Sequence, residues 1–478
     1  MQFFGMTFGE LLGKIDDFVW GVPLIVLILA VGLLLTFRTK FTQVFRLGKA
    51  LRYMFKNEDN ETGDVTSFGA LCTALSATIG TGNIVGVATA VCAGGPGALF
   101  WMEVAAFFGM ATKYAEGLLA VKYRSVDSDG KILGGPFYYI EKGMGKGFKW
   151  LAVLFAIFGM CVGLMGIGTF TQINGITSCV NNFFDANAEH IAFSLGGNQY
   201  TWATVIAGSI VTVCVALVII GGIQRIAKVS EIVVPFMAIL YISFALILIF
   251  TNITKVPEAI VLIVKGAFNP KAVTGGVVGT MIIAMQKGIA RGIFSNEAGL
   301  GSAPIAAAAA QTKQPVRQGL VCMTGTFFDT IIVCTMTGLA IVLTGAWKVE
   351  GLEGAQVTTY AFQNGLQFMN PTLSEFILMV CLAFFAFTTI LGWDYYSEKC
   401  LQYLVGNKKK LILGFRWLYI ACIFIGPYLT VSAVWTIADI FNGLMAIPNV
   451  IALIALSGVV ARETKAYMKG LKDGTIEE

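Results

Sequence analysis

The chain of 478 residues is 56% hydrophobic and only 13% charged, with a formal net charge of +5. Soluble domains carry about a quarter charged residues, so this composition excludes an ordinary soluble protein and indicates an integral membrane protein. The ten cysteines include no CxxC pair and the single histidine, His190, falls in a polar loop, which leaves metal, redox and histidine-relay chemistry without support.

Eleven apolar segments are long enough to cross the roughly 30 Å hydrocarbon core of a bilayer. Because lipid offers the backbone no hydrogen-bond partners, we expect each of them to be helical. The first contains an apolar run of 20 residues at 18–37. This run is longer than a typical signal-peptide core and lacks a basic flank, so we interpret it as a retained helix. The predicted spans are 17–37, 67–93, 97–121, 150–180, 202–222, 230–251, 272–295, 318–346, 374–396, 412–428 and 431–460.

The loops between these spans alternate in their content of basic residues. One side collects 24 of the 33 lysines and arginines, and the other side collects five. Because basic loops stay in the cytoplasm, this asymmetry predicts an outside N-terminus and a cytoplasmic C-terminus in a plasma membrane. It also accounts for the positive net charge without a nucleic-acid partner.

The ten spans after the first divide into two sets of five near residue 260. We therefore predict an N-terminal helix and cytoplasmic linker over 1–66, two halves over 67–251 and 252–460, and a cytoplasmic tail over 461–478. An odd number of helices per half gives the halves opposite orientations, which is the layout of an inverted repeat.

The first helix of each half is interrupted by glycine. One reads SATIGTGNIVG, with Gly80, Thr81, Gly82, Asn83 and Gly86, and the other reads MQKGIARGIFSNEAG, with Gly288 and Gly292 and then Asn296 and Gly299. An interior glycine costs about 1 kcal/mol relative to alanine, and paired interruptions in corresponding positions point to a transporter's binding site. Opened turns would offer N–H groups to a carboxylate and carbonyls to a cation. The alternative is close helix packing on a face of small residues.

Two adjacent hydroxyl side chains, Thr388 and Thr389, interrupt the apolar stretch AFFAFTTILGW. Oxygen ligands suit hard cations such as sodium, so these hydroxyls together with backbone carbonyls could hold Na⁺. The alternative is that both hydroxyls bond back to carbonyls of their own helix.

The chain resembles the alanine or glycine:cation symporter family in the segments GTGNIVGVATAVCAGGPGALFWM, FGMATKYAE, GGPFYYIEKGM, ARGIFSNEAGLGSAPIAAAAA and FFAFTTILGW. That family is similar in architecture to the bacterial leucine transporter. The resemblance implies an all-α integral membrane protein of eleven transmembrane helices, with one N-terminal helix before a five-plus-five inverted repeat. It implies a symporter, not an enzyme, that couples inward sodium flow to uptake of alanine or glycine by alternating access. Sodium would be the coupling ion, and no cofactor is expected.

The resemblance also implies which residues form the site. Substrate contacts would come from two interrupted helices and one polar side chain between them, at Thr81, Gly82, Asn83, Gln172, Met285, Gly288 and Ile289. Sodium would be held by the carbonyls of Ser76, Ile79 and Phe385 with the hydroxyls of Thr388 and Thr389. A second sodium would lie near Thr78 and Asn83.

Several charged residues leave alternatives open. Glu103 stands where the resemblance leads us to expect an apolar or aromatic residue, and charges inside a membrane are costly and usually functional. It either braces a broken helix or binds a proton or a cation, and proton coupling in the same fold is the alternative function. Lys287, Arg291 and Glu297 are expected to form an inner gate network. A compact glycine-rich site argues against a channel, and the absence of a nucleophile–base pair in the sequence argues against a membrane enzyme.

Overall fold

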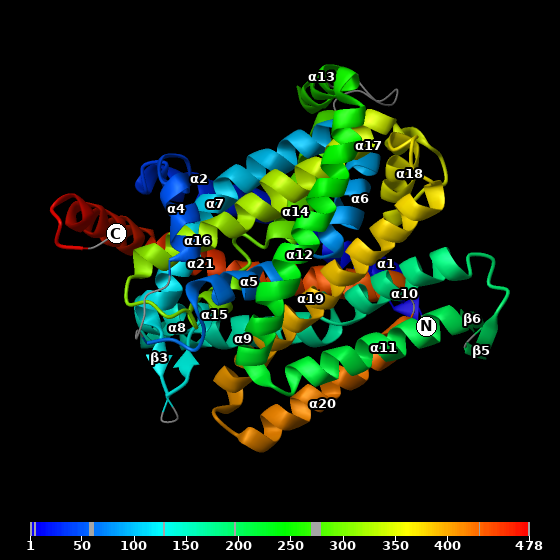
Figure 1. Ribbon diagram of the computed structural model, residues 1–478. Coiled ribbons are helices and arrows are strands. Elements are labelled where there is room, and N and C mark those ends of the chain that lie inside the picture. The colour runs from blue at the N-terminus through cyan, green and yellow to red at the C-terminus, as the bar shows by residue number, and fades with distance from the viewer. Residues whose placement is uncertain are drawn as a thin grey trace.

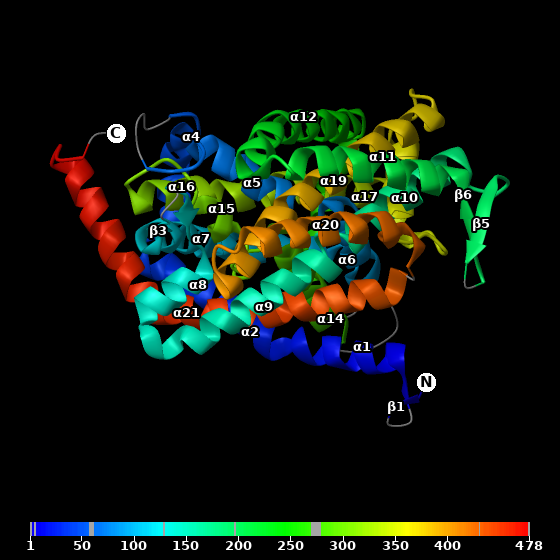
Figure 2. The same cartoon turned by 90° about the horizontal axis from the view of Figure 1, so that it is seen from below.

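The structure is a computed structural model that describes residues 2–3, 6–56, 62–127, 130–195, 197–268, 279–429 and 431–476. Long helices dominate it and lie side by side in one bundle (Figure 1). The N- and C-terminal ends of the chain lie at opposite ends of this bundle (Figures 1 and 2). This placement agrees with the odd number of spans that the sequence predicts.

The first half of the chain contains twelve α-helices and three short irregular ones. They are α1 Phe8–Val19, α2 Val22–Arg38, α3 Thr42–Phe45, α4 Leu47–Phe55, α5 Ser67–Thr78, η1 Gly82–Gly86, α6 Val87–Gly94, α7 Gly97–Tyr123, α8 Pro136–Tyr139, η2 Ile140–Met144, η3 Lys146–Phe148, α9 Lys149–Met165, α10 Phe170–Phe184, α11 Trp202–Ile219 and α12 Gly222–Thr251.

The second half continues with helices of similar length. They are η4 Ile253–Lys255, α13 Val256–Phe268, α14 Gly279–Asn296, α15 Ala303–Ala307, α16 Pro315–Thr326, η5 Phe327–Cys334, α17 Thr335–Thr344, η6 Ala346–Lys348, α18 Ala355–Gly365, α19 Pro371–Val405, α20 Lys409–Ile425, η7 Gly426–Tyr428 and α21 Val431–Lys472. Six short strands form three antiparallel pairs, β1 Gln2–Phe3 with β2 Met6–Thr7, β3 Ser125–Val126 with β4 Ile132–Leu133, and β5 Ile191–Leu195 with β6 Asn198–Thr201.

The predicted class of an all-α membrane protein is confirmed. Within the described residues, nine helices are long and apolar enough to cross a membrane, or ten if the bent pair of α5 with η1 and α6 counts as one span. The remaining predicted span, 272–295, corresponds to α14, which carries the charges of Lys287 and Arg291. The first part of that prediction, 272–278, lies outside the described residues.

Burial separates central helices from peripheral ones. The middle and end of α7 are buried almost continuously from Ala105 to Val121, with only Phe107 and Phe108 partly exposed. In contrast, α11 exposes Ile206, Ile210 and Leu217, as expected of a helix that faces lipid. Helix α7 is therefore a central, buried helix against which α14, α16 and α2 pack.

Small residues let α7 and α14 approach closely. An added Cβ at Gly288 would lie 2.1 Å from the carbonyl oxygen of Ala98, and one at Gly292 would lie 3.0 Å from Cγ of Met102. Helix α14 runs without interruption through both glycines. The prediction that the second broken helix opens at Gly288 is therefore wrong, and close packing, the alternative, is what these glycines serve.

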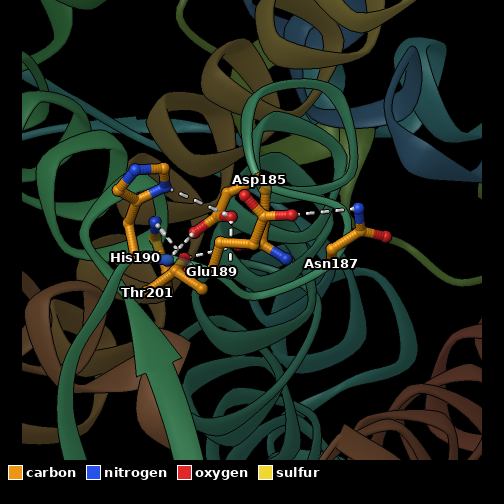
Figure 3. A network of polar contacts seen from close by, with 7 residues as sticks. Asp185, Asn187, Glu189, His190 and Thr201 are labelled. Atoms are coloured by element: carbon orange, nitrogen blue, oxygen red, sulfur yellow. Dashed lines mark hydrogen bonds and ion pairs between the residues drawn. The ribbon is translucent and has the colours of Figure 1, made fainter.

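A polar turn ties α10 to the β5–β6 hairpin at the end of the bundle that holds the N-terminus (Figures 1 and 3). The Asp185 carboxylate accepts hydrogen bonds from the backbone N–H groups of Glu189 at 2.8 Å and His190 at 3.1 Å. Burial acts to raise the pKa of Asp185, but these hydrogen bonds outweigh it and lower the pKa. The only histidine thus belongs to a loop structure.

We expect Gly288→Ala to lower the free energy of unfolding by about 1–3 kcal/mol, since the new methyl group must push α14 away from the α7 backbone. The measurement is the Tm of the purified protein in detergent. Gly414→Ala is the matched control, because Gly414 lies within α20 and a Cβ there meets nothing within 4 Å. Equal Tm values for the two variants would contradict this packing argument.

Candidate functional site

The first helix of the first half is interrupted where the sequence predicts. Helix α5 ends at Thr78, and the chain resumes helical structure at Gly82 with a bend of 51°. The N–H of Gly80 donates to Oδ1 of Asn83 at 2.9 Å, and the N–H of Thr81 donates to Oε1 of Gln172 at 3.4 Å. Side chains therefore satisfy the backbone groups that the break releases, as burial demands.

The second interruption lies at the Asn296 and Gly299 end of the predicted motif, not at Gly288. Helix α14 ends at Asn296, and the following segment has positive φ at Glu297 (56°), Gly299 (91°) and Gly301 (83°) before α15 begins. Left-handed conformations end a helix, and glycine adopts them without steric cost. The helix breaker is therefore the NEAGLGS segment, not the pair Gly288 and Gly292.

A cavity of about 870 Å³, which we call the main cavity, reaches the first interruption. Thr81 and Gly82 lie at its deep end, where Thr81 is fully buried, and Glu353 lies at its exposed mouth. Polar side chains of α10, among them Asn174 and Ser178, form one wall. The hydroxyl of Thr81 is buried and has no hydrogen-bond partner within the described part of the chain, so it is available to a ligand.

Several predicted substrate residues do not reach this cavity. From α14 the lining includes Arg291 and Phe294, whereas Met285, Gly288 and Ile289 are not part of it. These three lie about two to three turns before the actual break, and Gly288 faces the backbone of α7. The α14 residues that do line the cavity come later in the helix and include Phe294, whose ring would be 3.5 Å from a Cβ on Gly82.

Two other predicted residues support the unwound segment from behind. Asn83 and Gln172 are buried, and both bond the backbone of the break. Neither lines the main cavity. They hold the segment that carries Thr81 and Gly82, and in this conformation they do not face the open space.

The predicted sodium residues converge between α5 and α19. The Thr389 hydroxyl lies 3.4 Å from the Ile79 carbonyl oxygen and 2.9 Å from that of Phe385, to which Thr388 also donates at 3.0 Å. Gly80, whose N–H would bond the Ser76 carbonyl in a continuing helix, donates instead to Asn83. The interruption thus frees carbonyl groups at the end of α5 next to two hydroxyls.

This set of oxygens fits a sodium ion chemically. Both threonines do bond back to their own helix, as the alternative proposed, but a hydroxyl that donates its hydrogen keeps its lone pairs for a cation. Ser76 and both threonines are buried, and the Ser76 hydroxyl, which donates to the Thr73 carbonyl, keeps its lone pairs in the same way. Such a site would consist of neutral oxygen ligands from two helices.

A buried carboxylate, Asp329, links the two interruptions and was missed in the sequence analysis. It accepts hydrogen bonds from Asn83 (2.8 Å), Ser295 (2.9 Å) and Thr330 (2.7 Å). Asn83 comes from the first break, while Ser295 immediately precedes the second. One available signal was an aspartate inside the apolar span 318–346, because such a charge is costly in a membrane.

The expected inner network of Lys287, Arg291 and Glu297 does not form. Arg291 lies 3.6 Å from the Asp439 carboxylate, at the wall of the main cavity. Glu297 instead accepts hydrogen bonds from the Trp393 indole at 3.0 Å and from Ser302. Arg291 and Glu297 are six residues apart, about 9 Å along a helix, so they lie at different depths of the bundle.

A second network of hydrogen bonds lies outside the lining of the main cavity. Oε1 of Glu116 accepts hydrogen bonds from Asn449 at 2.7 Å and from the N–H of Gly299 at 3.1 Å, and Asn449 also donates to the Gly299 carbonyl at 2.9 Å. We call these three residues the inner latch. It joins α7 and α21 to the second interruption.

Known proteins match this chain over nearly its whole length. A family model described as "Sodium:alanine symporter family" matches residues 6–478. "Sodium/alanine symporter AgcS" of Methanococcus maripaludis is 46% identical over 470 residues, covering 97% of this chain and 98% of that protein. "Probable sodium/glutamine symporter GlnT" of Bacillus subtilis is 38% identical over 468 residues, covering 97% and 92%.

A solved structure shares the fold. The crystal structure of MhsT in complex with L-phenylalanine matches with a TM-score of 0.55 at 13% identity, covering 85% of this chain and 99% of that one. At this identity the likeness concerns the fold alone. It agrees with the predicted leucine-transporter architecture.

We expect Gly80→Ala to weaken sodium binding at least tenfold, because its Cβ would lie 2.5 Å from the Thr389 hydroxyl. The measurement is the rise in Tm with increasing sodium, where a tenfold loss of affinity removes about 1.4 kcal/mol of stabilisation at saturating concentrations. Gly86→Ala is the control, because it lies on the same segment with nothing within 4 Å of its Cβ. A sodium response in Gly80→Ala equal to that of the control would exclude this geometry.

Proposed function

Because the chain belongs to the sodium:alanine symporter family, we propose that it carries alanine or glycine into the cell with sodium across the plasma membrane. The observation that carries this proposal is the main cavity, which ends at Thr81 and Gly82, directly after the break in the helix. A membrane-embedded helix break at the end of a cavity is where alternating-access carriers bind their substrates.

The shape of the deep end favours a small amino acid. A Cβ on Gly175 would lie 2.8 Å from the Thr81 side chain, and one on Gly82 would be 3.5 Å from the Phe294 ring. The close approach of Gly175 to Thr81 therefore leaves little room between α10 and Thr81 at the deep end. The free Thr81 hydroxyl and the N–H groups at the start of η1 are suited to the substrate carboxylate.

The position of the proposed sodium site beside the helix break supports sodium coupling. A cation held by the carbonyl of Ile79 and the hydroxyls of Thr388 and Thr389 would join α5 to α19 at the residue that precedes Gly80. Fixing that residue orders the segment that binds substrate, so each ligand favours the conformation that the other needs. A membrane potential of 100 mV and a tenfold sodium gradient together support accumulation of about 500-fold.

The direction of access agrees with this proposal. The mouth of the main cavity opens between segments that the distribution of basic residues assigns to the outside, with an outside N-terminus and a cytoplasmic C-terminus. The inner latch of Glu116, Asn449 and Gly299 lies on the opposite side of the site. The conformation therefore corresponds to a carrier that is open outward and closed inward.

Proton coupling in the same fold is the second candidate. The carboxylate of Asp329 touches Asn83 and so communicates with the unwound segment. Oε1 of Glu103 is buried without a hydrogen-bond partner among the described residues. Either carboxylate could carry a proton, or Asp329 could take part in binding a second sodium near Asn83.

We expect Thr389→Ala to abolish sodium-driven accumulation of labelled alanine in proteoliposomes, since it removes a hydroxyl that faces the Ile79 carbonyl. Thr389→Ser keeps the hydroxyl and is expected to restore most of the uptake. Uptake is compared with and without an inward sodium gradient. Accumulation that persists in Thr389→Ala with an unchanged sodium dependence would refute the proposed ion site.

We expect Asp329→Asn to raise the sodium concentration for half-maximal uptake at least tenfold, because it removes a buried negative charge bonded to Asn83. Glu103→Gln is the matched control, because it also replaces a buried carboxylate by a neutral amide, and it should leave the sodium dependence of uptake unchanged. Wild-type uptake driven by a pH gradient without sodium, and lost in either variant, would instead establish the proton-coupled candidate.

A further inference from the structure

The N-terminal helices α1 and α2 pack against the last helix, α21, at the edge of the bundle (Figure 2). A Cβ on Gly443 of α21 would lie 2.4 Å from Cγ1 of Val19 and 3.0 Å from the indole nitrogen of Trp20. Glycine at this position therefore permits a contact that any larger residue would block.

One directional bond fixes this contact. The indole N–H of Trp20 donates to the backbone carbonyl of Asp439 at 2.8 Å. Asp439 is also the residue whose side chain pairs with Arg291 across α21 and α14. The N-terminal helix thus holds the backbone of a residue that lines the main cavity.

The pair of Arg291 and Asp439 depends on such support. The nearest approach of the two side chains is 3.6 Å, and the Oδ1 atom of Asp439 is buried with no hydrogen-bond partner in the part of the chain that the structure describes. A partly buried ion pair stabilises only when its geometry is well held. The backbone position of Asp439 is therefore decisive for the pair.

The pair also lies in line with the substrate segment. The guanidinium of Arg291 lies 5.4 Å from the centre of the Phe294 ring, and that ring in turn packs beside Gly82. Moving outward from the site, the order is Gly82, Phe294 and Arg291. Closing the distance between Arg291 and Asp439 would cover the unwound segment.

A separate cavity of about 220 Å³ lies on the other side of the pair. The N-terminal helix contributes Asp16, Asp17 and Trp20 to its lining, and α14 contributes Lys287 together with Arg291. The smaller cavity thus places the carboxylates of Asp16 and Asp17 in the same lining as Arg291. Without a fixed Asp439, the guanidinium has another acidic surface toward which it can turn.

We propose that Trp20 is a positioning residue of the outer gate. By holding the Asp439 carbonyl, it places the carboxylate for Arg291 and so favours closure of the main cavity over bound substrate and sodium. This inference rests on the proposed function for the nature of the ligands. It gives the N-terminal helix, which lies outside the repeated halves, a role in transport.

The test uses Trp20→Phe, which keeps the ring and removes the donor. The probe is a membrane-impermeant maleimide that alkylates the native Cys92, an exposed residue that lines the main cavity, with labelling read by mass spectrometry on the purified full-length protein. In the wild type, sodium plus alanine should slow this alkylation. Trp20→Phe should lose about fivefold of that protection, the factor equivalent to about 1 kcal/mol for one hydrogen bond, and should raise the KM for alanine with less effect on the maximal rate.

Trp101→Phe is the matched control, because the Trp101 indole also donates to a backbone carbonyl, that of Ala267, at 3.2 Å and away from the gate pair. It should leave the protection of Cys92 unchanged even if it lowers the Tm. Asp439→Asn should reproduce the effect of Trp20→Phe, and the double variant should show less than the sum of the two effects because both act on one pair. Equal protection in Trp20→Phe and wild type, or full additivity, would overturn the inference.

The outcome separates this inference from the proposed function. If sodium and alanine fail to protect Cys92 in the wild type, the proposed ligands are wrong. The inference is then judged on the alkylation rate without ligands, which should be about fivefold faster in Trp20→Phe than in Trp101→Phe. Equal rates in the two variants would reject it.

Discussion

A helix that opens inside a membrane must find partners for its free backbone groups within the protein, because lipid supplies none. Asn83 meets this demand on both sides. Its oxygen accepts the Gly80 N–H, and its nitrogen donates to the carboxylate and carbonyl of Asp329. The unwound segment, the carbonyls that face Thr389, and the link to the second interruption all depend on this one amide.

The same constraint applies to any movement of the break. Asn83 and Gln172 hold its N–H groups without lining the main cavity. A movement that separates the Thr81 N–H from Gln172 must therefore give that N–H another partner. An exchange of partners costs little, whereas exposing an unpaired buried amide costs about 1–3 kcal/mol.

Much of this architecture was predictable, and the failures have physical causes. The helical class and the break at Gly80–Asn83 follow from apolar length and from two glycines beside an asparagine. Gly288 and Gly292 were expected to open a helix in the same way, although they lie four residues apart with no asparagine beside them, and they serve contact with Ala98 and Met102 of α7. That packing role could not be predicted from local sequence, because it depends on the distance to a helix almost 200 residues earlier in the chain.

Asp329 is the opposite case. The sequence shows a carboxylate in an apolar span, but it does not show which residues that carboxylate contacts. A carboxylate in an apolar span indicates function, but its partners Asn83 and Ser295 come from two other helices, at sequence separations of 246 and 34 residues. Only the packed structure shows that one charge touches both breaks. A single buried carboxylate in that position makes the two interruptions one electrostatic unit, so a change of charge there, by a proton or by a neighbouring cation, must act on both halves of the site together.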